Sequence, residues 1–131
     1  MFLEFNKDNI KYEIVDTVGS GSLKGTVYTT YAKLNELFGE PTVNDANPNE
    51  KVNMEWVIEG KVYFTNDYGE EDWEYVKATV YNWKTGSVPL GEYGWHIGGD
   101  SYESVELIDA IIENNIKAEY NYNERLFADL T

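Results

Sequence analysis

The residues best suited to chemistry lie in one short acidic segment, NDYGEEDWEYV, at positions 66–76. It interleaves five carboxylates with three aromatic rings: Asp67, Tyr68, Glu70, Glu71, Asp72, Trp73, Glu74 and Tyr75. The carboxylates repel one another, and the first cation after them is Lys77. Such a segment fits a metal loop, a catalytic carboxylate pair, a solvated hairpin tip or a surface that imitates nucleic acid.

Metal binding and catalysis are weakly indicated by the sequence. A calcium loop places oxygen ligands at alternate positions around a glycine turn, and NDYGEEDWE lacks that D-x-D-x-D-G order. The single histidine, His96, is followed by Asp100 and Ser101, but a catalytic triad is defined by geometry and not by adjacency in sequence. We therefore expect no metal, no cofactor, no catalytic residue and no enzymatic activity.

The glycine-rich stretch VGSGSLKGT resembles a phosphate-binding loop only superficially. Lys24 precedes Gly25, whereas the P-loop order G-x-x-x-x-G-K-[ST] requires the reverse. The residues that follow have the pattern of a strand, where a dinucleotide-binding fingerprint needs a helix. We interpret GSGSLKG as a turn.

The net charge is −14, from 24 acidic and 10 basic side chains, and residues 66–131 carry −10 of it. Binding to phosphates needs lysine and arginine, so we expect no direct contact with nucleic acid or with anionic membranes. A strongly basic protein would be attracted instead. The absence of cysteine, of a long apolar run and of a basic N-terminal start indicates a soluble intracellular protein.

The elements that position these residues form one α+β domain over residues 1–131. A strand is expected at 10–18, and Thr29 or Thr30 can cap a short helix that ends at Gly39. VNMEWVIEG and KVYFTN predict a hairpin that turns near Glu59 and Gly60. The predicted architecture is a mostly antiparallel sheet with one short and one longer helix packed on it.

In the second half of the chain, residues 73–84 predict a strand and residues 101–115 predict a helix. In WEYVKATVYNWK (73–84), Val76, Ala78 and Val80 face the core, and Trp73, Tyr75, Tyr81 and Trp83 face the other way. SYESVELIDAIIENN (101–115) predicts the longer helix, capped by Asp100 or Ser101, with Val105, Ile108, Ile111 and Ile112 buried. The tail from Lys117 predicts an edge strand or a second short helix.

Acidic side chains also line the far side of the longer helix. Glu106, Asp109 and Glu113 share one face there and repeat every 4.5–6 Å or so of axial rise. Alternate side chains in a strand lie about 6.6–6.8 Å apart. Duplex DNA carries one charge per about 1.7 Å of axis, so two acidic elements on one surface could occupy a basic channel that normally holds a duplex.

Four motifs resemble a pattern in small uncharacterised proteins of bacteriophages and mobile elements. They are TYAKLNELFGEPT, MEWVIE, ATVYNWK and GWHIGGDS, and the similarity covers roughly residues 29–108. The resemblance implies a small acidic accessory protein in the cytoplasm of a host bacterium, a group in which inhibitors of host defence are common. Several unrelated ones, including anti-CRISPR and anti-restriction proteins, act as DNA mimics.

The sequence hypothesis is therefore an acidic DNA mimic that blocks a basic nucleic-acid-binding channel in a host CRISPR effector or restriction enzyme. A Cas9-type effector is the foremost candidate because its cleft grips a PAM duplex and a guide–target heteroduplex. The predicted partner-binding residues are Asp67, Tyr68, Glu70, Glu71, Asp72, Trp73 and Glu74, with Glu106, Asp109 and Glu113 secondary. Alternatives are a nucleotide-binding protein using GSGSLKG, Trp95 and His96, a metal-dependent enzyme, and a virion or assembly protein.

Overall fold

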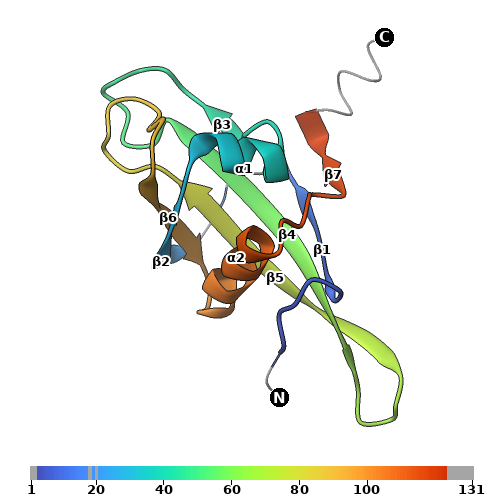
Figure 1. Cartoon of the computed structure of the whole chain (residues 1–131). Coiled ribbons are helices and arrows are strands. Elements are labelled where there is room, and N and C mark those ends of the chain that lie inside the picture. The colour runs from blue at the N-terminus through green and yellow to red at the C-terminus, as the bar shows by residue number, and fades with distance from the viewer. Residues whose placement is uncertain (1–2, 18, 20, 124–131) are drawn as a thin grey trace.

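A seven-stranded sheet organises the chain in the computed structural model, which describes residues 3–17, 19 and 21–123. The elements are β1 (Ile10–Ile14), β2 (Ser22–Thr29), α1 (Tyr31–Phe38), β3 (Val43–Asn44), β4 (Met54–Thr65), β5 (Glu71–Tyr81), β6 (Tyr93–Gly99), α2 (Glu103–Glu113) and β7 (Tyr120–Asn121) (Figure 1). The strand order is β2-β6-β5-β4-β1-β7, and β3 pairs with the start of β4. Every pairing is antiparallel except that of β1 with β7. The predicted α+β class is confirmed.

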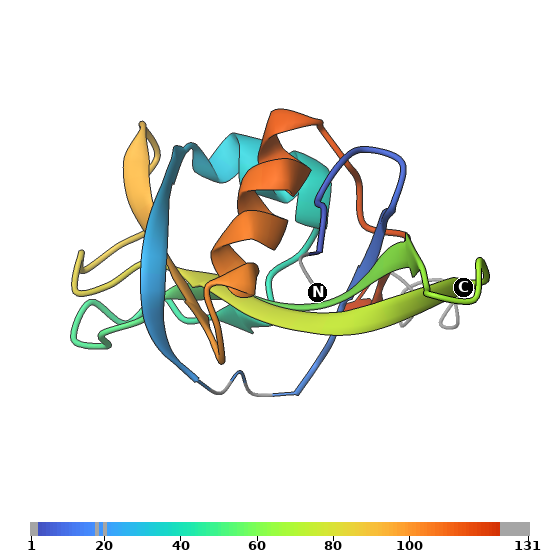
Figure 2. The ribbon, with the colours of Figure 1, turned by 90° about the horizontal axis from the view of Figure 1, so that it is seen from below.

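Both helices lie on one face of the sheet (Figure 2). Alternate residues of β4 and β5 point toward that face, so Trp56, Val62, Val76 and Val80 are buried there. Trp56 lies at the centre of an aromatic core, with ring centroids 5.9 Å from Phe38 of α1 and 5.7 Å from Trp95 of β6. Its indole N–H donates to the carbonyl of Gly39 at 2.9 Å. The helix face of the sheet is the hydrophobic core.

The predicted turn at Glu59 and Gly60 is wrong, because β4 runs through these residues without interruption to Thr65. Gly60 serves helix packing instead. A Cβ atom on it would lie 3.0 Å from the Leu107 side chain of α2 and 3.2 Å from the Val76 carbonyl. The glycine therefore lets α2 approach the sheet, and the hairpin turns further on, at Asn66–Glu70.

The short helix α1 agrees with its predicted caps. The Thr30 hydroxyl accepts the Lys33 amide at 3.1 Å, and Gly39 ends the helix with φ 79°. Leu34, Leu37 and Phe38 are buried against the sheet.

The longer helix α2 agrees in position but not in its cap. It begins at Glu103 after the N-cap residue Tyr102, so neither Asp100 nor Ser101 is the N-cap, although the Ser101 hydroxyl accepts the Glu103 amide at 3.3 Å. Leu107 is fully buried and Ile112 only partly, because the sheet meets the helix slightly to one side of the predicted stripe. Of the predicted tail, Tyr120–Asn121 forms an edge strand, and residues 124–131 lie outside the described part.

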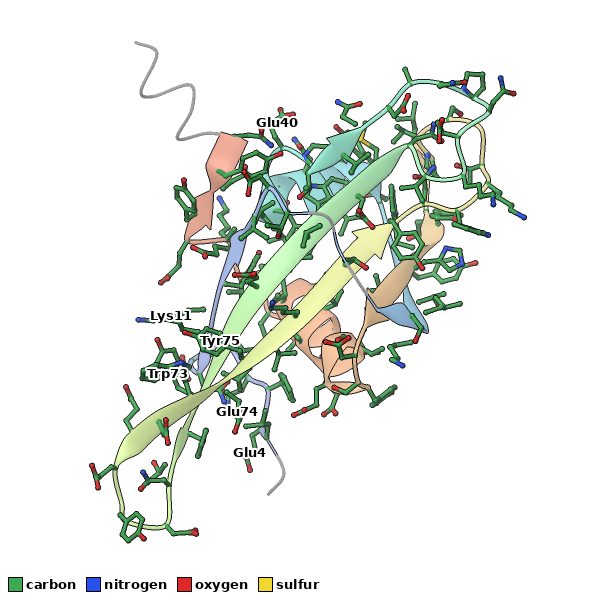
Figure 3. The ribbon with its side chains drawn as sticks, turned by 180° about the vertical axis from the view of Figure 1, so that it is seen from behind. Glu4, Lys11, Glu40, Trp73, Glu74 and Tyr75 are labelled. Atoms are coloured by element: carbon green, nitrogen blue, oxygen red, sulfur yellow. The ribbon has the colours of Figure 1, made fainter. Side chains whose placement is uncertain are left out.

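No helix of the described residues lies on the other face of the sheet, where the described part of the connection from β1 to β2 runs across β4 and β5 (Figures 2 and 3). The Val15 amide donates to the Val57 carbonyl at 3.0 Å, and Gly19 lies directly against the Thr79 side chain. This crossing divides the open face into two parts. One part lies toward the β4–β5 hairpin, and the other lies over β6 and β2.

Candidate functional site

The β4–β5 hairpin carries the acidic segment and projects beyond the rest of the sheet (Figures 1 and 2). The two strands pair without a break from Glu55 and Tyr81 to Thr65 and Glu71. Because the pairing reaches the turn itself, the hairpin holds its acidic end away from the hydrophobic core.

The turn is ordered by one side chain. The Asn66 carboxamide oxygen accepts the amides of Tyr68 at 2.9 Å and Glu70 at 3.0 Å. The Asn66 amide donates to the Glu70 carbonyl, and Gly69 adopts φ 76°, which favours glycine. The acidic end is thus a hydrogen-bonded turn of defined shape.

All five predicted carboxylates of the hairpin are exposed to solvent. They are Asp67, Glu70, Glu71, Asp72 and Glu74. Within residues 3–17, 19 and 21–123 the only ion pairs join Lys33 to Glu36 and Lys77 to Glu59, so none of the five is neutralised by a cation. The hairpin end therefore presents a concentrated negative charge.

Aromatic rings and lysines occupy the open face at the base of the hairpin. Trp73 lies opposite Tyr63 with ring centroids 6.2 Å apart, and the Lys61 ammonium lies 5.2 Å from the Trp73 ring and 5.7 Å from the Tyr75 ring. Lys11 of β1 lies 5.5 Å from the Tyr63 ring. Figure 3 shows Lys11, Trp73 and Tyr75 at this end of the sheet.

A groove of about 230 Å³ runs beside these rings. It is lined by basic, acidic and aromatic side chains, which include Lys11, Glu13, Glu59, Lys61, Tyr63 and Tyr75. Strand alternation places Asp72 and Glu74 on the other side of the hairpin, which continues the helix-bearing face of the sheet but is exposed at these two residues. The hairpin therefore has an acidic tip and one aromatic face, on which cations already stack.

The three acids of α2 are not brought together with those of the hairpin. Glu106 and Glu113 are exposed, and Asp109 is partly buried. Partial burial and the neighbouring Glu113 raise the pKa of Asp109. Both views show α2 over the body of the sheet and the hairpin end projecting away from it, so the acids form two separate groups (Figures 1 and 2).

His96 belongs to an aromatic stack and not to a triad. Its ring stacks on Tyr81 with centroids 5.4 Å apart and a 21° angle between planes, and its Nδ1 atom is buried without a hydrogen-bond partner. Asp100 and Ser101 are exposed at the start of α2, and the Ser101 hydroxyl is bonded to the helix amide. The alternative hypothesis of a nucleotide pocket included Trp95 among its lining residues. The Trp95 side chain cannot line such a pocket, because it is fully buried in the core.

The predicted turn at GSGSLKG is only partly correct, because β2 begins at Ser22 and residues 22–25 lie in the strand. Gly21 has φ 110° and leaves no room for a side chain beside the Gly99 backbone. Ser22 begins β2, and the Lys24 ammonium donates to the Ser22 hydroxyl at 2.9 Å. The segment therefore has no helix after its glycines on which a phosphate could rest.

Strand register reveals a row of titratable groups that sequence reasoning did not identify. Glu55, Tyr81 and His96 stand side by side on three adjacent strands. Burial raises the pKa of Glu55, and burial together with the Glu55 and Tyr93 charges raises the pKa of Tyr81. Strand alternation in the sequence places Glu55 and Tyr81 on the same face as the other odd-numbered residues of their strands. Only the pairing register shows that they are direct neighbours and that His96 lies beside Tyr81.

In the described part of the chain, no three His, Asp or Glu side chains are arranged to hold a metal ion. No helix there is long and apolar enough to cross a membrane.

Comparison with protein-family models, with curated proteins and with solved structures finds no match for this chain.

Proposed function

We propose that this chain is a binding protein, without enzymatic activity, whose β4–β5 hairpin enters the basic nucleic-acid-binding cleft of another protein and excludes the nucleic acid. One observation carries the proposal: five exposed carboxylates, none paired with a cation in the described part of the chain, stand on an ordered hairpin that projects from the fold. Holding anions together in this way is unfavourable for the free protein. A cationic cleft relieves that repulsion.

The shape of the hairpin supports this function. A hydrogen-bonded turn loses little conformational entropy on binding, so more of the electrostatic attraction remains as affinity. Along β5, Asp72 and Glu74 lie on one side at a spacing of about 6.6–6.8 Å. Regularly spaced anions on a narrow ribbon offer a basic cleft the kind of charge that a nucleic-acid backbone offers.

The ring face of the hairpin adds an anchor. Trp73 is 44% exposed and Tyr75 is 64% exposed, so both rings are accessible to another protein. Tyrosine and tryptophan are enriched among the residues that dominate the energy of protein interfaces. Together with the resemblance to phage and mobile-element proteins, these features favour a host defence nuclease as the partner, either a CRISPR effector or a restriction enzyme.

The test is capture of partners from a bacterial lysate on the immobilised full chain, at low and high salt. We expect a basic nucleic-acid-binding protein that elutes as salt rises, because exposed ion pairs are screened. The purified partner should then lose a fluorescently labelled DNA duplex when the chain is added, as followed by anisotropy.

Two charge-reversal variants make the test specific to the hairpin. Changing Glu70, Glu71 and Asp72 to lysine should abolish both capture and competition. Changing three exposed acids elsewhere, Asp8, Glu40 and Glu50, to lysine alters the net charge equally and should leave most of the competition intact. Equal loss in both variants, or a captured partner that binds no nucleic acid, contradicts the proposal, and capture that ignores salt favours an assembly protein.

A further inference from the structure

Carboxylates and aromatic rings alternate along β5 from Asp72 to Tyr75. Successive side chains of a strand point to opposite sides, so Asp72 and Glu74 lie on one side of the hairpin, and Trp73 and Tyr75 lie on the other. All four residues are exposed. This part of the hairpin therefore presents anions on one side and rings on the other.

The pairing with β4 keeps the two sides chemically distinct. The residues opposite the carboxylates are apolar, since Phe64 pairs with Asp72 and Val62 pairs with Glu74. No cation of the described residues forms an ion pair with either carboxylate. On the ring side the Lys61 ammonium lies 5.2 Å and 5.7 Å from two ring centroids, which shows that these rings accept a cation over their faces.

The exposed rings distinguish two kinds of nucleic acid that the hairpin could imitate. A duplex hides the faces of its bases within the stack and presents phosphates outward. An unpaired strand presents its bases beside its phosphates, and proteins that bind such strands combine a basic groove for the backbone with aromatic or arginine side chains that stack on the bases. The hairpin has the arrangement of the unpaired strand.

The dimensions of the hairpin point the same way. Its two strands lie about 4.8 Å apart, whereas the major groove alone of a duplex is about 12 Å wide. Duplex DNA carries one charge per about 1.7 Å of axis, and the carboxylates on one side of β5 are spaced by about 6.6–6.8 Å. A ribbon this narrow and this dilute in charge matches one extended strand better than a duplex.

We propose that the cleft entered by the hairpin is one that holds an unpaired nucleic-acid strand, an inference that rests on the proposed function. Asp72 and Glu74 take the places of phosphates and meet lysine or arginine side chains of the partner. Trp73 and Tyr75 take the places of bases and stack on the aromatic or guanidinium groups that normally hold them. The duplex-binding channel expected from the charge alone is thereby narrowed to a groove for a single strand.

Competition at the purified partner tests the inference. Two labelled DNAs are used, an oligothymidine strand and a duplex of equal length, each at its own dissociation constant, and displacement by the full chain is followed by anisotropy. We expect half-displacement of the strand at a chain concentration lower by about tenfold, because the duplex also contacts parts of the cleft that the narrow hairpin does not reach.

The outcomes separate this inference from the proposed function. Half-displacement of both DNAs at the same chain concentration overturns the inference alone, as does a partner that binds the duplex and not the strand. A partner that loses neither DNA, or capture of no nucleic-acid-binding protein, overturns both.

Two double variants test whether the rings stack as bases do. Trp73→Ala with Tyr75→Ala should raise the dissociation constant of the partner complex by about tenfold or more and remove the preference for displacing the strand. Trp73→Phe with Tyr75→Phe keeps the ring faces but loses the N–H and O–H groups, so most of the affinity and the preference should remain. Equal losses in the two variants would mean that the polar tips make the contact, which contradicts the inference.

Tyr28→Ala with Tyr102→Ala is the matched control, because these residues are 76% and 65% exposed in other parts of the chain. It should leave the dissociation constant unchanged. Circular dichroism checks that each variant keeps the fold. A loss in this control as large as that of the Trp73 and Tyr75 alanine variant contradicts the role of the hairpin rings.

Discussion

Glu55 shows at the scale of a single residue how an open sheet face can hold a destabilising charge. It lies partly buried beside Tyr81, and its carboxylate makes no hydrogen bond or ion pair with the described residues. Burial removes water from the carboxylate and raises its pKa. The folded protein therefore holds this proton more tightly than the unfolded chain.

The pH dependence of stability follows from that direction. A carboxyl whose pKa is raised by folding favours the folded state when protonated, so its contribution is lost as pH rises from the ordinary glutamate value through the raised one. Glu55→Gln should increase the free energy of unfolding at neutral pH and flatten its decline between acidic and neutral pH. Urea unfolding at a series of pH values measures both effects.

Glu50→Gln is the matched control for that experiment, because Glu50 is exposed on the preceding loop. It should leave the pH profile close to that of the unaltered chain. A Glu55→Gln variant that is less stable at neutral pH would show that the carboxylate has a stabilising partner instead.

At the scale of the element, the Asn66 side chain holds the turn of the hairpin in shape, and the pairing of β4 with β5 lets the hairpin project from the sheet. Two amides of the turn have the Asn66 side chain as acceptor, whereas the strands below are held by regular pairing and by Tyr63 against Trp73. The tip and the strands can therefore be perturbed separately.

Asn66→Ala should loosen the tip while the fold remains intact. The Tyr68 and Glu70 amides lose their acceptor, so their hydrogen exchange should become faster, and global stability should fall by about 1 kcal/mol, the typical contribution of a side-chain hydrogen bond. Exchange measured by NMR at Tyr68 and at Val80 separates the two effects, since Val80 lies in the buried part of β5. Equal acceleration at both positions would mean that the turn is needed for the whole sheet.

At the scale of the whole molecule, the net charge of −14 opposes folding into a small volume. The interior compensates with its aromatic core around Trp56 and with buried aliphatic residues from both helices. Stability should accordingly respond to ionic strength as well as to core substitutions.

Sodium chloride should raise the urea midpoint of unfolding, because it screens repulsion that the unfolded, expanded chain experiences less. The triple variant with lysine at positions 70, 71 and 72 should respond less to the salt, since the densest group of anions is gone. A midpoint independent of salt would show that the acids are too far apart in the fold to repel one another appreciably.

The sequence by itself determined what depends on near neighbours. Alternation along 73–84 correctly separated Val76, Ala78 and Val80 from the exposed rings, and the turn and cap residues located α1. The exposure of the five hairpin acids also agrees with their composition, because that many unpaired carboxylates cannot be buried.

Only the tertiary structure decided what depends on distant neighbours. Gly60 has the local pattern of a turn, but it lies in a strand that pairs there with Tyr12 of β1 and Val76 of β5. The row of Glu55, Tyr81 and His96 and the separation of the two acidic groups likewise follow from the order and register of the strands. Order and register are set by contacts between residues far apart in the chain, which local periodicity does not encode.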